Sequence, residues 1–168
     1  PGWERLGAPV SPRRPRRPLA DQLEYREANG GDAMSATAYS LVGLISWALI
    51  LLIVMEVIRT YLVVSGRVPA NGFAPDNGGL SPFMQRLARA HANCIEGLPI
   101  FGGLLGVAIM TSRTALTDPL AYELLGARLV QSVIHLVSTS EIAVSLRFTA
   151  FAVQMAIGAY WAWALLSQ

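Results

Sequence analysis

The residues best suited to chemistry lie in the stretch RLARAHANCIEGLP, residues 86–99, which leads directly into an apolar run. Four polar residues of this stretch have the spacing i, i+3, i+7 and i+10 and form what we call the polar stripe: Arg86, Arg89, Asn93 and Glu96. On a helix turning about 100° per residue they share one face. Two guanidinium groups, an amide and a carboxylate can bind a zwitterionic, peptide-like ligand through directional hydrogen bonds. The alternative is a stripe that only joins helices through buried ion pairs.

Glu96 stands about one turn before the apolar run, residues 100–110. A charged side chain at a membrane centre costs about 2.5 to 3.5 kcal/mol, so such residues usually face a bundle interior and mark function. We expect its partner to be an arginine of the stripe, or an arginine of another helix or subunit. Gly97 and Pro99 predict a kink just beyond it.

The composition indicates an integral membrane protein. Of the 168 residues, 53% are hydrophobic and only 14% are charged, and the mean hydropathy of +0.43 is too high for an ordinary soluble domain of this size. The single cysteine, Cys94, excludes an intrachain disulfide and is interpreted as a packing residue. Neither His91 nor His135 has clustered cysteines or carboxylates, so no metal site is predicted, and no nucleic-acid motif is found in the apolar part of the chain.

Four helical segments are predicted to cross the bilayer, for which about 20 residues suffice. The apolar part of the second, residues 98–110, is too short to span alone, so the polar turns before it are expected to extend into the membrane. The predicted helices cover approximately residues 35–58, 81–111, 120–137 and 143–166. The second starts with the favourable pair Ser81 and Pro82, after a loop rich in proline and glycine. The predicted fold class is therefore an all-α bundle of four transmembrane helices.

The third and fourth predicted helices also carry polar faces. Arg128, Gln131 and His135 lie within one narrow arc of the third helix, and Arg147 and Gln154 are seven residues apart on the fourth. Such faces point to the interior of a membrane bundle. By its residue type alone, His135 is interpreted equally well as an interhelical hydrogen-bonding residue and as a ligand contact.

Residues 1–33 differ in composition from the remainder, with PRRPRRP at 12–18 followed by small polar residues. We predict a disordered extension that is not part of the working protein, and a transmembrane domain over residues 34–168. The alternative is a basic arm that binds anionic lipid or nucleic acid. Arginines flank the first loop, so the positive-inside rule places that loop and the polar stripe on the cytoplasmic side. The expected location is the bacterial inner membrane.

The polar stretch resembles a signature of the membrane-associated proteins in eicosanoid and glutathione metabolism, the MAPEG family. In that family the run has the form R-x-x-R-A-(H/Q)-x-N-x-x-E-x-x-P, and five polar positions and a proline recur here in register. The resemblance implies a four-helix membrane protein, a homotrimer, that binds glutathione between adjacent subunits. Arg89, Asn93 and Glu96 would then be glutathione contacts.

Two further segments are similar to family patterns. The segment RVPANGFAPD, residues 67–76, resembles the first loop, and the resemblance makes Arg67 a partner for a glutathione carboxylate. The alternative is that Arg67 serves only as an orientation signal. The run GARLVQSVIHL resembles the third-helix form G-A-R-x-x-H-x-x-x-Y-L, which places Arg128, Gln131 and His135 among the glutathione-binding residues. Gln131 and His135 depart from the histidine and tyrosine that are common there.

The segment RFTAF, residues 147–151, resembles the R-x-x-A-F that opens the last helix of the family, after about three extra loop residues. The resemblance assigns Arg147 to activation of the glutathione thiolate. A guanidinium is always charged and favours a thiolate, which is the nucleophilic form. Lowering the pKa of the thiol by two units corresponds to about 2.7 kcal/mol.

The function implied is a glutathione-dependent transferase that conjugates lipophilic electrophiles or reduces lipid hydroperoxides. Glutathione would be its co-substrate, without a metal, and its partners would be other copies of the chain in a homotrimer, membrane lipid and a lipophilic small molecule, with no nucleic acid. The alternative is a non-enzymatic relative that binds lipid or a protein partner, which the residues Gln131 and His135 favour. A small transporter is disfavoured because the chain has no inverted repeats.

Overall fold

The computed structural model describes residues 18, 21 and 34–167, so the predicted N-terminal extension lies almost wholly outside the described residues. The described chain contains helices and connecting turns, and it has no strand. The four long helices are α2 (Ala36–Val64), α3 (Pro82–Met110), α4 (Asp118–Val137) and α5 (Glu141–Leu166), and a short 3₁₀ helix, η1 (Thr114–Leu116), lies between α3 and α4.

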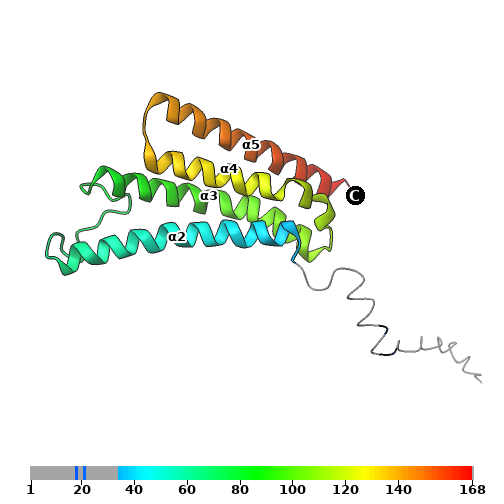
Figure 1. Ribbon diagram of the computed structural model, residues 1–168, viewed down its shortest axis with the longest axis horizontal. Coiled ribbons are helices and arrows are strands. Elements are labelled where there is room, and N and C mark those ends of the chain that lie inside the picture. Colours follow the sequence, from blue (N-terminus) through cyan, green and yellow to red (C-terminus); the bar gives the residue numbers. More distant parts are fainter. Residues whose placement is uncertain (1–17, 19–20, 22–33, 168) are drawn as a thin grey trace, which may run out of the picture. The chain divides into compact units, whose positions relative to one another are not determined.

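The four long helices run alternately up and down and lie side by side along their length (Figure 1). Each is long and apolar enough to cross a membrane, which confirms the predicted bundle of four transmembrane helices. Helix α4 packs closely on α5, and α2 packs closely on α3, whereas α3 and α5 meet much less. The sparse packing between α3 and α5 leaves space along their junction.

Serine caps start three of the helices. The hydroxyl of Ser35 accepts a hydrogen bond from the Ala38 amide at 3.2 Å, that of Ser81 from the Met84 amide at 3.3 Å, and that of Ser140 from the Ala143 amide at 3.3 Å. Pro82, which has no amide hydrogen to leave unpaired, follows the second cap. The pair Ser81 and Pro82 gave the predicted start of α3 and the apolar run gave that of α2, and both lie within one residue of the observed starts.

Helix α2 continues six residues beyond its predicted end at residue 58. The charged residues Glu56 and Arg59 do not end the helix, because both have polar partners nearby. Arg59 Nη1 lies 3.0 Å from Glu56 Oε1, and Arg59 Nη2 donates to Asn77 Oδ1 at 2.6 Å. The amide of Asn77 in turn donates to the Met84 carbonyl at 2.9 Å, which ties the first loop to the start of α3.

Polar side chains join helix ends that are distant in the sequence. Asp118 at the start of α4 accepts hydrogen bonds from the Thr37 amide at 2.8 Å and the Thr37 hydroxyl at 2.6 Å, at the positive end of α2. Arg86 Nε donates to the Leu136 carbonyl at 2.8 Å, and Arg113 Nη1 donates to the Leu165 carbonyl at 2.8 Å. These bonds satisfy carbonyls that helix ends leave free and fix the relative heights of the helices.

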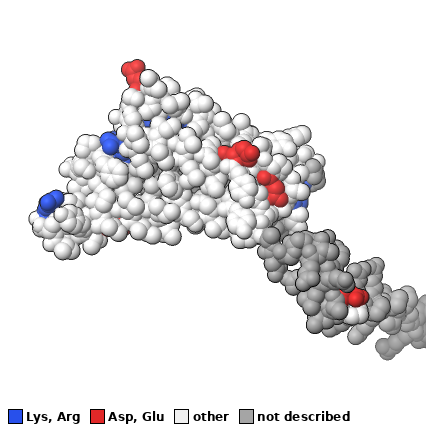
Figure 2. Space-filling model, viewed as in Figure 1, with Lys and Arg blue, Asp and Glu red and all other residues white. Residues whose placement is uncertain are grey.

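Most of the core between the helices is apolar, although it also holds buried polar side chains, and most of the outer surface is apolar. One buried cluster contains Leu44, Phe101, Leu105, Leu124, Ile157 and Trp161. Many large apolar side chains of the helices are exposed, as lipid contact requires. Figure 2 shows an outer face of the bundle that carries only a few charged side chains.

Candidate functional site

A network of polar side chains, three of them buried and one, Asn93, half-buried, joins α3, α4 and α5. Arg128 Nη1 donates to the side-chain oxygen of Asn93 at 2.7 Å, to the Asn93 carbonyl at 3.2 Å and to Gln131 Oε1 at 3.2 Å. Gln154 Nε2 donates to the same Gln131 oxygen at 3.0 Å. We call these four residues the buried network. Arg128 is 2% exposed and Gln154 is fully buried, so the network lies inside the bundle.

Arg128 is a buried cation without a carboxylate partner among the described residues. Its charge is instead stabilised by the oxygens of Asn93 and Gln131 and by the face of Phe101, whose ring centre lies 5.5 Å from the guanidinium carbon. Gly97 makes room for this arrangement, because a Cβ there would overlap Arg128 Nη2. The guanidinium is therefore fitted to its place by packing as well as by hydrogen bonds.

The other residues of the polar stripe do not take part in the buried network. Arg89 and Glu96 are exposed on the surface of the chain, and the one ion pair in the described residues is Arg59 with Glu56. No ion pair joins Glu96 to an arginine of the stripe, since residues seven apart are separated by about 10 Å along a helix axis. Arg86 bonds to a carbonyl of α4 instead. Within one chain, Arg89 and Glu96 are available to a ligand or to another subunit.

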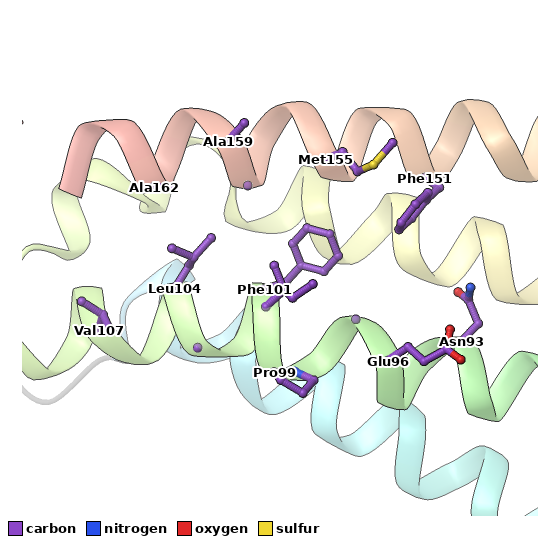
Figure 3. Close-up of a pocket in the computed structure, with 14 residues that line it drawn as sticks. Asn93, Glu96, Pro99, Phe101, Leu104, Val107, Phe151, Met155, Ala159 and Ala162 are labelled. Carbon is purple, nitrogen blue, oxygen red and sulfur yellow. The ribbon is translucent and has the colours of Figure 1, made fainter. Parts of the chain in front are cut away.

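A cavity of about 680 Å³ lies along the junction of α3 and α5. We call it the α3/α5 groove, and Figure 3 shows its lining. Its polar side chains, Asn93 and Glu96, stand together near one end, and the other lining residues are apolar or glycine, among them Phe101, Leu104, Val107, Phe151, Met155 and Ala162. From Asn93 to Val107 the groove follows α3 for about 21 Å, at 1.5 Å per residue. It is thus a long apolar groove with one polar end.

Arg147 and His135 form a second polar contact between α4 and α5. Arg147 Nη1 lies 2.7 Å from His135 Nδ1. A guanidinium can only donate, so Nδ1 is the acceptor and the imidazole is neutral, with its proton on Nε2. Arg147 precedes the groove residue Phe151 by one helical turn, which places the Arg147–His135 pair next to the polar end of the groove.

The predicted site residues therefore fall into groups. Asn93, Arg128 and Gln131 are brought together in the buried network, and His135 contacts Arg147. Arg67 lies in the exposed loop after α2, with its guanidinium carbon 5.6 Å from the centre of the Tyr61 ring. No described hydrogen bond or ion pair links Arg67 to the α3 residues.

The sequence interpretation did not predict two features of this site. Gln154 was recognised as polar but was not assigned to the site, although an amide within an apolar helix is itself a signal. The support of Arg128 by Gly97 and Phe101 depends on contacts between helices that spacing along one helix cannot reveal. The interpretation of Cys94 as a packing residue agrees with its burial, and its sulfur lies 3.4 Å from the Ser132 hydroxyl oxygen. Among the described residues, no group of histidine, cysteine or carboxylate side chains could hold a metal.

The fold and the groove define a class of protein, an integral, multi-pass membrane protein with four helices and a polar site beside an apolar groove. The model of the MAPEG family matches residues 42–167, which is most of the chain, and the chain therefore belongs to the MAPEG family. This family includes glutathione transferases and related proteins. No curated protein and no solved structure matches the chain.

Proposed function

We propose that this protein is a glutathione-dependent transferase that conjugates lipophilic electrophiles within the membrane. The α3/α5 groove carries the proposal, because it joins a polar end suited to a peptide thiol with an apolar length suited to a lipophilic substrate. Membership of a family that includes glutathione transferases supports the same chemistry. Reduction of a lipid hydroperoxide by two thiols, giving an alcohol, water and a disulfide, is the related reaction that the same site could perform.

Glutathione is proposed to bind at the polar end of the groove through Arg89, Asn93 and Glu96. Arg128 holds the side-chain oxygen of Asn93, so the amide hydrogens of Asn93 remain free to donate to the peptide. Arg128, together with Gln131 and Gln154, would then act on the ligand by orienting Asn93. The exposure of Arg89 and Glu96 supports a homotrimer in which a neighbouring subunit covers them and adds contacts, with Arg67 as one candidate.

Arg147 is proposed to stabilise the glutathione thiolate. One of its five N–H groups faces His135, and the others can face the sulfur. The thiolate forms a carbon–sulfur bond with the electrophilic carbon, and in a conjugate addition the neighbouring carbon takes up a proton from water. The lipophilic substrate would reach the groove laterally from the bilayer. The site would lie on the cytoplasmic side of a bacterial inner membrane, as the arginines around the first loop suggest.

The experiment that tests this function is calorimetric titration of glutathione into the purified protein in detergent. Saturable binding is expected for the unmodified protein and is expected to be lost in Glu96→Gln. The matched control is Glu123→Gln, which removes an exposed carboxylate of α4 that does not line the groove, and which should bind normally. No binding by folded, unmodified protein would refute the glutathione function. A bundle that binds lipid or a protein partner would then be the better account.

A further inference from the structure

A second, much smaller cavity is bordered by α2, α3 and α4 and lies next to the α3/α5 groove. We call it the small cavity. It is lined by Leu44, Cys94, Gly97, Leu98, Phe101 and Arg128. Gly97 and Phe101 also line the groove, so the two spaces are neighbours. The small cavity has room for about one water molecule. It can therefore hold an added oxygen atom but not a peptide or a lipid chain.

One donor of Arg128 beside this cavity has no acceptor. Nη1 makes the hydrogen bonds of the buried network, whereas Nη2 is buried and has no hydrogen-bond partner among the described residues. The side chain is 2% exposed. Nη2 lies against Gly97, which lines the small cavity. Because a buried charged donor without an acceptor is costly, this part of the cavity favours an oxygen atom that accepts a hydrogen bond.

The thiol of Cys94 borders the same cavity from α3. Its sulfur is 3.4 Å from the hydroxyl oxygen of Ser132, which follows Arg128 by one turn of α4. In the lining of the small cavity, Cys94 carries the one nucleophilic atom and Arg128 the one charge. A thiolate is the form of a cysteine that oxidants attack, and cations near the sulfur favour that form. The cavity therefore combines an oxidisable sulfur with a donor suited to the oxidised product.

We propose that Cys94 is a modification site that hydrogen peroxide oxidises to a sulfenic acid, whose oxygen occupies the small cavity and accepts a hydrogen bond from Arg128 Nη2. The sulfur attacks one oxygen of the peroxide, and a sulfur–oxygen bond forms as the oxygen–oxygen bond breaks. The thiol proton joins the second oxygen, which leaves as water. The sulfur is oxidised and the peroxide is reduced. The size of the cavity selects this small oxidant, because a lipid hydroperoxide does not fit beside Cys94.

The test exposes the full chain in phosphatidylcholine nanodiscs to hydrogen peroxide, without glutathione. The protein is then unfolded in denaturant that contains dimedone, which traps sulfenic acids and does not react with oxidised methionines. Mass spectrometry measures the adduct on Cys94, and Cys94→Ala is the control that should give none. We expect the adduct to increase with the time of exposure. Recovery of Cys94 without the adduct would overturn the proposal, whether or not glutathione binds elsewhere.

Two variants test the guanidinium and the cavity separately. Arg128→Met removes the charge and the donors and should slow adduct formation about tenfold or more. An equal rate would overturn the role of Arg128. Leu98→Phe keeps the guanidinium and should slow the reaction similarly, because the larger side chain fills the cavity. Its matched control is Leu104→Phe, since Leu104 lies on the same helix and lines the groove but not the small cavity. Equal rates in the two phenylalanine variants would overturn the placement of the oxygen, and this comparison stands even where Arg128→Met does not fold.

Discussion

Helix α3 carries two kinds of polar residue, and they differ in whether the chain satisfies them. Asn93 is bonded to Arg128, which in turn reaches Gln131, and these residues are largely enclosed by the bundle. One turn or less away, Arg89 and Glu96 are exposed and have no ion-pair partner among the described residues. Polar residues satisfied within a subunit maintain its shape, whereas unsatisfied ones at membrane depth need a ligand or another subunit. In the proposed site the buried network would therefore position the ligand-binding residues, and the exposed residues would contact the ligand.

The largest expected effect is the loss of activity on substitution of Arg147. Arg147→Ala should lower the rate of thioether formation about 100-fold, which corresponds to the two pKa units by which a guanidinium beside the sulfur would favour the thiolate. Thermal stability should change little, because Arg147 is only half-buried. The measurement is turnover at saturating glutathione, alongside an unfolding curve. Undiminished turnover in the variant would remove Arg147 from the mechanism.

A substitution of Gly97 should show the opposite pattern and lower the stability of the fold, because Gly97 packs against the buried network. Gly97→Ala places a Cβ against Arg128 Nη2, so the guanidinium must shift away from Asn93. We expect a loss of about 1 to 3 kcal/mol in the free energy of unfolding, as for other overpacked sites. The matched control is Gly106→Ala, where a Cβ meets nothing within 4 Å. Equal stability of the two variants in detergent unfolding would show that Arg128 moves without cost.

The two kinds of residue also differ in how well the sequence predicts them. Serine caps, Pro82 and the apolar segments act locally, so the helices followed from composition and spacing. The end of α2 was missed because Arg59 depends on Asn77, which lies 18 residues later. Spacing along α3 grouped Asn93 with Arg89 and Glu96, and Asn93 does stand beside Glu96 in the groove, but spacing did not predict its hydrogen bond to Arg128 on α4. Which face of a polar helix meets which neighbour is decided by packing between helices, and periodicity in one helix does not contain that information.

His135 combines features of both kinds of residue. It has a hydrogen-bond partner within the chain, and that partner, Arg147, is itself a proposed catalytic residue. His135→Phe removes the acceptor for Arg147 Nη1, and we expect about a tenfold fall in kcat with little change in the KM for glutathione, the size of one hydrogen bond to a charged group. His135→Gln keeps an acceptor oxygen and should retain most of the activity. The measurement is the full saturation curve of each variant. A fall in both variants alike would mean that the imidazole itself is required, as it would be in direct contact with glutathione.

The smallest effect is expected for the stability of Glu96→Gln. Glu96 makes no hydrogen bond or ion pair within the described chain and is exposed, so its neutral isostere should change the free energy of unfolding by no more than about 0.5 kcal/mol. The check is unfolding in detergent for this variant, measured together with its loss of glutathione binding. A loss of stability well above this value would mean that Glu96 is paired with a neighbouring subunit. Glu96 would then be a structural residue, like the members of the buried network. Which residues position the site and which contact the ligand would then have to be decided for the assembled oligomer.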